Sequence, residues 1–225
     1  MSWQATGLAA LVLAVAHIAG AHARPSSPPL RSFAGGVGVA YVFAVILPLL
    51  SDWQGVLRDE QDAERLIFLV ALAGLAGFYV VEHGALALDR RKRSHAAAWV
   101  QIGGFILYSL AVGFVLADYG ERSVIWLMGY TGAIGLHFYM NARSTMTGRE
   151  QPVLGKWLMS GAVILGWAVG CLLPHHYQIA NLLFAGMAGA TILSIMTHEL
   201  PSQEKAAPLA FLIGVVAVTM LSLIS

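Results

Sequence analysis

Charge is scarce in this sequence: Asp, Glu, Lys and Arg make up 11% of the 225 residues, against about 25% in an ordinary soluble domain. Hydrophobic residues make up 58%, and the mean hydropathy is +0.71. A soluble domain of this length would have to expose much of that apolar surface to water, which leads to aggregation. The composition therefore excludes a soluble enzyme, a disordered chain and a nucleic-acid-binding protein. It predicts a polytopic membrane protein surrounded by the lipid bilayer.

Cysteine is almost absent as well, since Cys171 is the only one in the chain. A single cysteine excludes a disulfide framework, a redox pair of thiols and a zinc site built from cysteines. The sequence also contains no paired nucleophile and base and no metal-binding triad, so we do not expect an enzyme.

Eight apolar segments approach the length of about 20 residues that a helix needs to cross a bilayer. They predict an all-α polytopic membrane bundle that forms a single transmembrane domain over residues 1–225. The predicted spans are 3–21, 33–50, 66–88, 96–117, 123–142, 153–173, 177–200 and 208–224. An alternative for the first span is a cleaved signal peptide, because Ala21-His22-Ala23 is similar to a cleavage site. The lack of a basic region before it favours a retained helix.

The basic residues are distributed unevenly between the loops. Ten of the 13 Lys and Arg residues fall in the odd-numbered loops and three in the even-numbered loops. Since cytoplasmic loops are enriched in Lys and Arg, the odd-numbered loops are predicted to be cytoplasmic. With eight spans in the cell (inner) membrane, both termini would then lie outside the cytoplasm.

The second and seventh spans share a sequence pattern. Both begin with Phe-Ala-Gly, at Phe33–Gly35 and Phe184–Gly186, carry another glycine three residues later, and close with Leu-Pro. Because the two spans would run in opposite directions, the pattern predicts an inverted repeat, which is typical of transporters. It also predicts that Gly38 and Gly189 lie against other helices rather than against lipid.

Ionisable side chains inside a membrane are costly, so they are functional candidates. His17, His137 and two pairs of neighbours lie toward the inner ends of their predicted spans. His137 and Asn141 are four residues apart and would share one face of a helix. Imidazole nitrogen and amide oxygen can both bind a divalent metal. The alternative is that both residues form hydrogen bonds to a neighbouring helix.

Two carboxylate–imidazole pairs lie near the inner interface: Glu82-His83 closes the third span, and His198-Glu199 closes the seventh. Together they would line an inner vestibule that suits a divalent cation or a proton relay. The alternative is that they are half-solvated helix ends with no joint role.

Several of these features together resemble the ZIP family of divalent-metal transporters, over most of the chain. The glycine-rich second span closing on Leu47-Pro48, the third span closing on Glu82-His83 and the seventh closing on Glu199–Pro201 are similar to helices of that family. The resemblance implies eight helices with both termini outside and an inverted repeat relating the first three helices to the last three. It implies a divalent metal ion such as zinc as substrate, and no certain resident cofactor.

The fourth helix of the family carries metal ligands that this sequence lacks. Alignment on Leu110–Gly113 places Gly104, Phe105 and Tyr108 where the family has histidine, asparagine and glutamate. His137 matches a histidine of the fifth helix, while Asn141 stands where the family has a carboxylate. The resemblance therefore carries over only these two residues to the central metal site.

Three functions follow from the sequence. The first is a divergent ZIP-like transporter of a divalent metal, with His137 and Asn141 as central ligands and Glu82, His83, His198 and Glu199 as an exit site. The second is a ZIP-fold protein that has lost transport and acts as a sensor or interaction partner. The third is a carrier of another solute that uses Tyr108, Phe138 and Tyr139 in place of metal ligands. The sequence leaves open whether the protein forms a homodimer.

Overall fold

The computed structural model describes residues 3–23, 27–54, 63–90, 94–119, 123–145, 154–173, 177–200 and 206–224. Within these ranges the chain forms helices and no strand. The helices are α1 (Trp3–His22), α2 (Pro28–Tyr41), η1 (Val42–Ile46), α3 (Leu47–Gln54), α4 (Ala63–Arg90), α5 (Ser94–Asp118), α6 (Val124–Thr145), α7 (Leu154–Leu172), α8 (Tyr177–Ser194), η3 (Ile195–Glu199) and α9 (Pro208–Ile224). Each of the eight predicted spans is helical. In the second span η1 joins α2 to α3, and in the seventh span η3 continues α8.

The described helices are apolar enough for a membrane protein. Five helical stretches have the length and composition needed to cross a bilayer: Trp3–His22, Pro28–Ser51, Arg65–Ala87, Ala98–Ala117 and Leu154–Leu172. Two shorter apolar helices cover Asn181–Thr197 and Pro208–Leu223. Many large apolar side chains also lie on the outside of the bundle, among them Leu107, Leu209 and Leu223. Such a surface is suited to lipid rather than to water, and the chain is a helical membrane protein.

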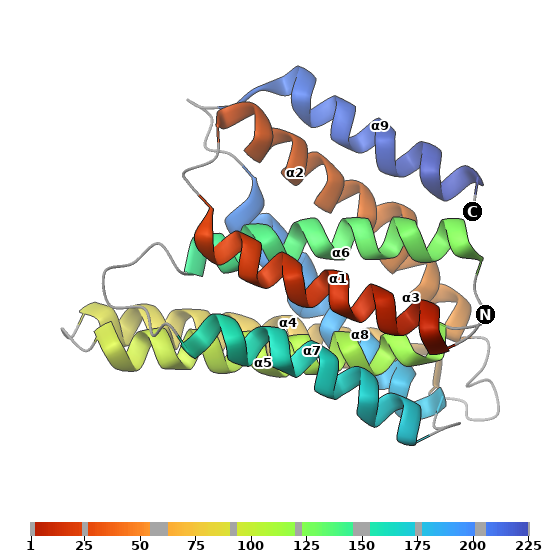
Figure 1. Cartoon of the computed structure of the whole chain (residues 1–225), viewed down its shortest axis with the longest axis horizontal. Helices are drawn as coiled ribbons and strands as arrows, with labels where there is room; N and C mark the ends of the chain where they lie inside the picture. Colours follow the sequence, from red (N-terminus) through yellow and green to blue (C-terminus); the bar gives the residue numbers. More distant parts are fainter. Residues whose placement is uncertain are drawn as a thin grey trace.

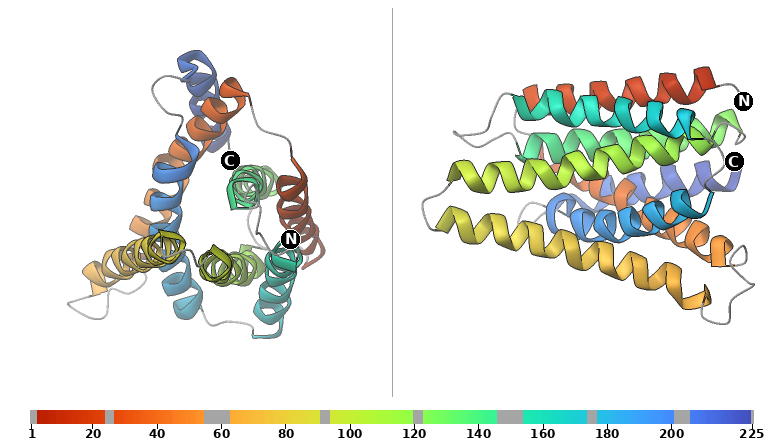
Figure 2. Two further views of the ribbon diagram at one scale, coloured as in Figure 1. Left: turned by 90° about the vertical axis from the view of Figure 1, so that its left-hand side faces the viewer. Right: turned by 90° about the horizontal axis from the view of Figure 1, so that it is seen from below.

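The helices lie side by side with their axes roughly aligned (Figures 1 and 2). The start of α1 and the end of α9 are at the same end of the bundle, which we call the terminal end (Figure 1). The most extensive contacts join α5 to α7, α4 to α8, α2 to α9 and α1 to α6. Because α1, α4, α6 and α8 all run away from the terminal end, their second halves lie toward the opposite end (Figures 1 and 2).

Glycines let the paired helices approach until backbone touches backbone. A Cβ atom on Gly74 of α4 would overlap the carbonyl oxygen of Gly186 on α8. In return, a Cβ atom on Gly189 of α8 would overlap the carbonyl oxygen of Ala71 on α4. In each helix the glycine follows the opposing carbonyl by three residues, so the two surfaces are complementary. Small residues at such crossings are how membrane helices pack closely.

The same reciprocal contact occurs in two other pairs of helices. The glycine and carbonyl partners are Gly36 with Phe211 and Gly214 with Phe33 between α2 and α9, and Gly113 with Val163 and Gly166 with Leu110 between α5 and α7. Gly38 and Gly189 are both buried, which confirms the prediction for them. On α2, Gly36 is the glycine whose Cβ would overlap the backbone of α9.

Both helices that carry the Phe-Ala-Gly pattern contain a π-helical turn directly before Leu-Pro. In the first, the N–H group of Leu47 donates to the carbonyl oxygen of Val42, five residues earlier. Pro48 has no N–H group to donate to Ala44, so an ordinary α-helical turn would lose a hydrogen bond here. In the second, η3 ends at Glu199, and the next residue, Leu200, adopts an extended conformation, as is usual for a residue that precedes a proline.

Candidate functional site

A group of polar side chains is buried inside the bundle, toward the end opposite the terminal end. It is formed by His17 of α1, Ser109 of α5, His137 and Asn141 of α6, and Thr191 and Ser194 of α8, and none of the six is more than 3% exposed. Tyr108 of α5 completes it, and we call these seven residues the central network. Arg143, two residues after Asn141 on α6, is buried as well.

Asn141 lies in the middle of one arm of the central network. Its amide nitrogen is 2.9 Å from Nε2 of His137, and its amide oxygen accepts a hydrogen bond of 3.2 Å from the hydroxyl of Ser194. With the amide oriented in this way, its nitrogen donates to Nε2 of His137. The prediction that His137 and Asn141 share one helix face is confirmed, and the two side chains are bonded to each other and to the neighbouring helix α8.

His17 forms a second arm with α5. Its Nε2 atom lies 3.0 Å from the hydroxyl oxygen of Ser109, and its ring stacks on Phe138 with centroids 4.1 Å apart. The other ring nitrogen, Nδ1, is buried and has no hydrogen-bond partner among the described residues. Such an atom is a place where water or a solute can bind.

Tyr108 joins α5 to α8. Its hydroxyl group is 2.7 Å from that of Thr191, which itself donates to the carbonyl oxygen of Met187 at 2.8 Å. Tyr108 therefore donates the shared hydrogen. The edge of its ring faces both His137 and Phe138, each at 5.7 Å between centroids. Where the ZIP resemblance places a metal-binding glutamate, this chain has a neutral hydroxyl group.

The residues of the predicted inner vestibule are placed only in part. Glu82 is half-buried and His83 is exposed on α4. The Nδ1 atom of His83 is 3.0 Å from the carbonyl oxygen of Tyr79, and the two rings stack at 3.8 Å. His198 and Glu199 belong to the backbone of η3, but their side chains lie outside the described residues. That the four side chains meet in one vestibule stays a prediction.

The described part of the chain offers little for a metal ion. It contains no group of three or more His, Cys, Asp or Glu side chains that could hold one. Nor do its buried polar side chains include a carboxylate. A divalent cation in the central network would therefore keep its charge uncompensated, in surroundings where such charge is costly.

Sequence reasoning identified His137, Asn141 and the intramembrane His17, but it missed their partners Ser109, Thr191 and Ser194. Serine and threonine occur in membrane helices as ordinary packing residues. Nothing in their spacing distinguishes the three that join the network from the others. A scan of the chain against protein-family models matches none, and a search of curated proteins finds no similar sequence.

Removing the hydroxyl group of Ser109 should destabilise the fold. In Ser109→Ala both ring nitrogens of His17 would be buried without a protein partner, which costs about 1–3 kcal/mol. The measurement is unfolding by SDS in mixed micelles. Thr219→Ala is the control, because the Thr219 hydroxyl bonds only to a carbonyl of its own helix. Equal stability of the two variants would contradict the importance of the His17–Ser109 contact.

Proposed function

We propose that this membrane protein is a carrier on a ZIP-like scaffold, and that its central site binds an uncharged polar solute in place of a divalent cation. The observation that carries this proposal is the central network itself. It includes residues of α5 and α6, the helices to which the resemblance assigns the central metal site, and it consists of hydroxyl, amide and imidazole groups without a carboxylate.

Three features of the fold support the ZIP-like scaffold. The described residues form eight helical segments, the two chain ends lie at one end of the bundle, and a π-helical turn precedes Leu-Pro in both the second and the seventh segment. In addition, α1 contacts α6 and α7, as expected of a retained helix rather than a cleaved signal. We infer that all eight segments cross the inner membrane, with an inverted repeat and both termini outside.

The chemistry of the network favours an uncharged solute. Hydroxyl, amide and neutral imidazole groups can each donate and accept hydrogen bonds, so they can replace the water shell of a solute with hydroxyl or amide groups. They cannot neutralise a cation. The Nδ1 atom of His17 has no hydrogen-bond partner among the described residues, so it keeps the capacity to bond a solute.

The test is transport by purified protein in lipid vesicles. We expect glycerol, urea or sorbitol to enter vesicles that contain the protein faster than they enter protein-free vesicles. Light scattering follows the entry. Zinc, manganese and nickel should enter no faster than into protein-free vesicles, because the site lacks negative charge. Zinc uptake that Asn141→Ala abolishes, or no flux of any of the three uncharged solutes, would overturn the proposal.

Metal transport through an inner site is the second candidate, and it is favoured by the half-buried Glu82 beside His83. In that case zinc should bind to the purified parent protein in a calorimetric titration. Glu82→Gln and Glu199→Gln should weaken this binding more than Asn141→Ala does, because only the carboxylates compensate the charge of the ion. The same titration separates an inner site from a central one.

A further inference from the structure

A second polar feature lies near the terminal end of the bundle, away from the central network. It is a cavity of about 260 Å³ between α2–η1–α3, α6 and α9. Its lining includes Tyr41, Ala44, Trp126 and Tyr130, and among the described side chains it has no Asp, Glu, Lys, Arg or His. The volume is far above the ~30 Å³ share of one water molecule and just below the ~300–1,000 Å³ of common ligand pockets. It therefore suits a small solute.

Two hydroxyl groups of this cavity's lining residues lack partners. Tyr41 and Tyr130 are each 2% exposed, and neither hydroxyl oxygen has a hydrogen-bond partner among the described residues. Leaving a buried hydroxyl unsatisfied costs about 1–3 kcal/mol, so native structures supply water or a ligand at such places. Two neighbouring buried hydroxyl groups without partners indicate a site for water or a small ligand.

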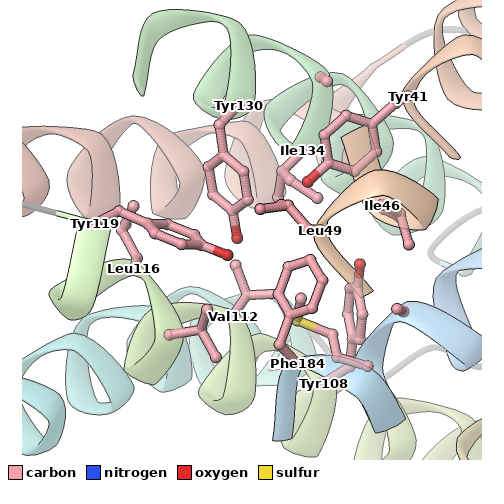
Figure 3. Packing of buried hydrophobic residues seen from close by; sticks show 14 of the residues in the cluster. Tyr41, Ile46, Leu49, Tyr108, Val112, Leu116, Tyr119, Tyr130, Ile134 and Phe184 are labelled. Carbon is pink, nitrogen blue, oxygen red and sulfur yellow. The ribbon is translucent and has the colours of Figure 1, made fainter. Parts of the chain in front are cut away.

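Tyr41 and Tyr130 share a core cluster with Tyr108 of the central network. Figure 3 shows the hydroxyl groups of Tyr41 and Tyr130 pointing into the interior, toward the same space that the hydroxyl groups of Tyr119 and Tyr108 face. The four rings belong to one core cluster. Tyr108, whose hydroxyl faces this space, is bonded to Thr191 of the central network.

We propose that this cavity is a hydrated vestibule that receives a small uncharged solute bearing hydroxyl groups and passes it toward Tyr108. The proposal rests on the proposed function of the central network. The Tyr41 and Tyr130 hydroxyl groups both donate and accept, as a polyol does. The stacked rings of Trp126 and Tyr130, with centroids 5.3 Å apart, provide an apolar face for its carbon atoms. The described lining residues carry no charge that would select an ion.

The π-helical turn η1 contributes to the wall of this vestibule. Ala44 and Pro48 both line it, and Pro48 lacks the N–H group that would normally bond to the Ala44 carbonyl. A π-helical turn is often found at a functional site.

Thiol labelling tests whether water reaches the vestibule. Cys171 is the only native cysteine, so Cys171→Ser gives a cysteine-free background. In this background Ala44→Cys should react with a charged thiol reagent, whereas Phe43→Cys should not, because Phe43 is 62% exposed on the lipid-facing side. Water is needed to form the reactive thiolate, so we expect a difference in rate of at least about tenfold. Open membranes give the reagent access from both faces.

Solute flux tests the role of the hydroxyl groups. Tyr41→Phe and Tyr130→Phe should each lower the flux of glycerol or sorbitol into vesicles severalfold, while Tyr79→Phe, on the outside of α4, should leave it unchanged. Equal labelling of Ala44→Cys and Phe43→Cys would overturn the vestibule even if flux is intact. Unchanged flux in both tyrosine variants would overturn the assigned solute site. Fast labelling of Ala44→Cys without any flux would retain the hydrated vestibule and contradict the carrier function.

Discussion

Gly74→Ala is expected to lower the free energy of unfolding strongly, although it adds a single methyl group. The added carbon would overlap the backbone carbonyl of Gly186, and a backbone cannot turn aside as a flexible side chain can. Helices α4 and α8 would have to separate along their whole crossing. Overpacking of this kind costs about 1–3 kcal/mol and occasionally more. The measurement is the free energy of unfolding by SDS in mixed micelles.

Gly77→Ala is the matched control, one turn further along the same helix. A Cβ atom on Gly77 would meet no other atom within 4 Å. Because alanine favours a helix over glycine by up to about 1 kcal/mol, this variant should be as stable as the parent or slightly more stable. If Gly74→Ala and Gly77→Ala had the same stability, the close backbone contact between α4 and α8 would be wrong.

Truncation of Phe138 is expected to have the largest effect on the central network. Its side chain is fully buried, stacked on His17 and in contact with the edge of Tyr108. Phe138→Ala would leave a cavity between α1, α5 and α6 and release the imidazole ring from its position. Removing a buried phenylalanine costs about 3–5 kcal/mol. In a bilayer this loss comes from packing contacts rather than from transfer out of water.

The measurement for Phe138→Ala is again unfolding by SDS, with solute flux measured in parallel. Phe43→Ala is the control, because this ring is exposed on the outside of the bundle and its loss should change stability by about 0.5 kcal/mol or less. A Phe138→Ala protein as stable as Phe43→Ala would show that Phe138 does not hold His17 in place.

The positions of the helices could be predicted because the bilayer imposes them. A segment must be apolar over a fixed length, and the polar breaks at 51–65 and 89–93 separate such segments clearly. The burial of Gly38 and Gly189 followed from the need of membrane helices for small residues. Which carbonyl each glycine meets could not be predicted, because it depends on the rotation and stagger of two helices.

The candidate site was predictable only within a single helix. His137 and Asn141 are neighbours because they are one turn apart, and the structure confirms this. The contacts of His17 with Ser109 and of Asn141 with Ser194 join residues that are 92 and 53 positions apart. They depend on how α1, α5, α6 and α8 are arranged. The cavity beside Tyr41 and Tyr130 likewise has no local pattern, because three separate parts of the chain enclose it.

The π-helical turn η1 changes how the two halves of its helix, α2 and α3, are rotated relative to each other about the helix axis. An α-helix rotates by about 100° with each residue, so the one extra residue of a wide turn changes which faces of the two halves are aligned. Tyr41 before the turn and Leu49 and Leu50 after it are all buried. In an uninterrupted α-helix, Leu49 and Leu50 would be rotated relative to Tyr41 by that amount. The turn therefore acts as a one-residue insertion that the fold has absorbed, and it lets both halves of a long helix face the same interior.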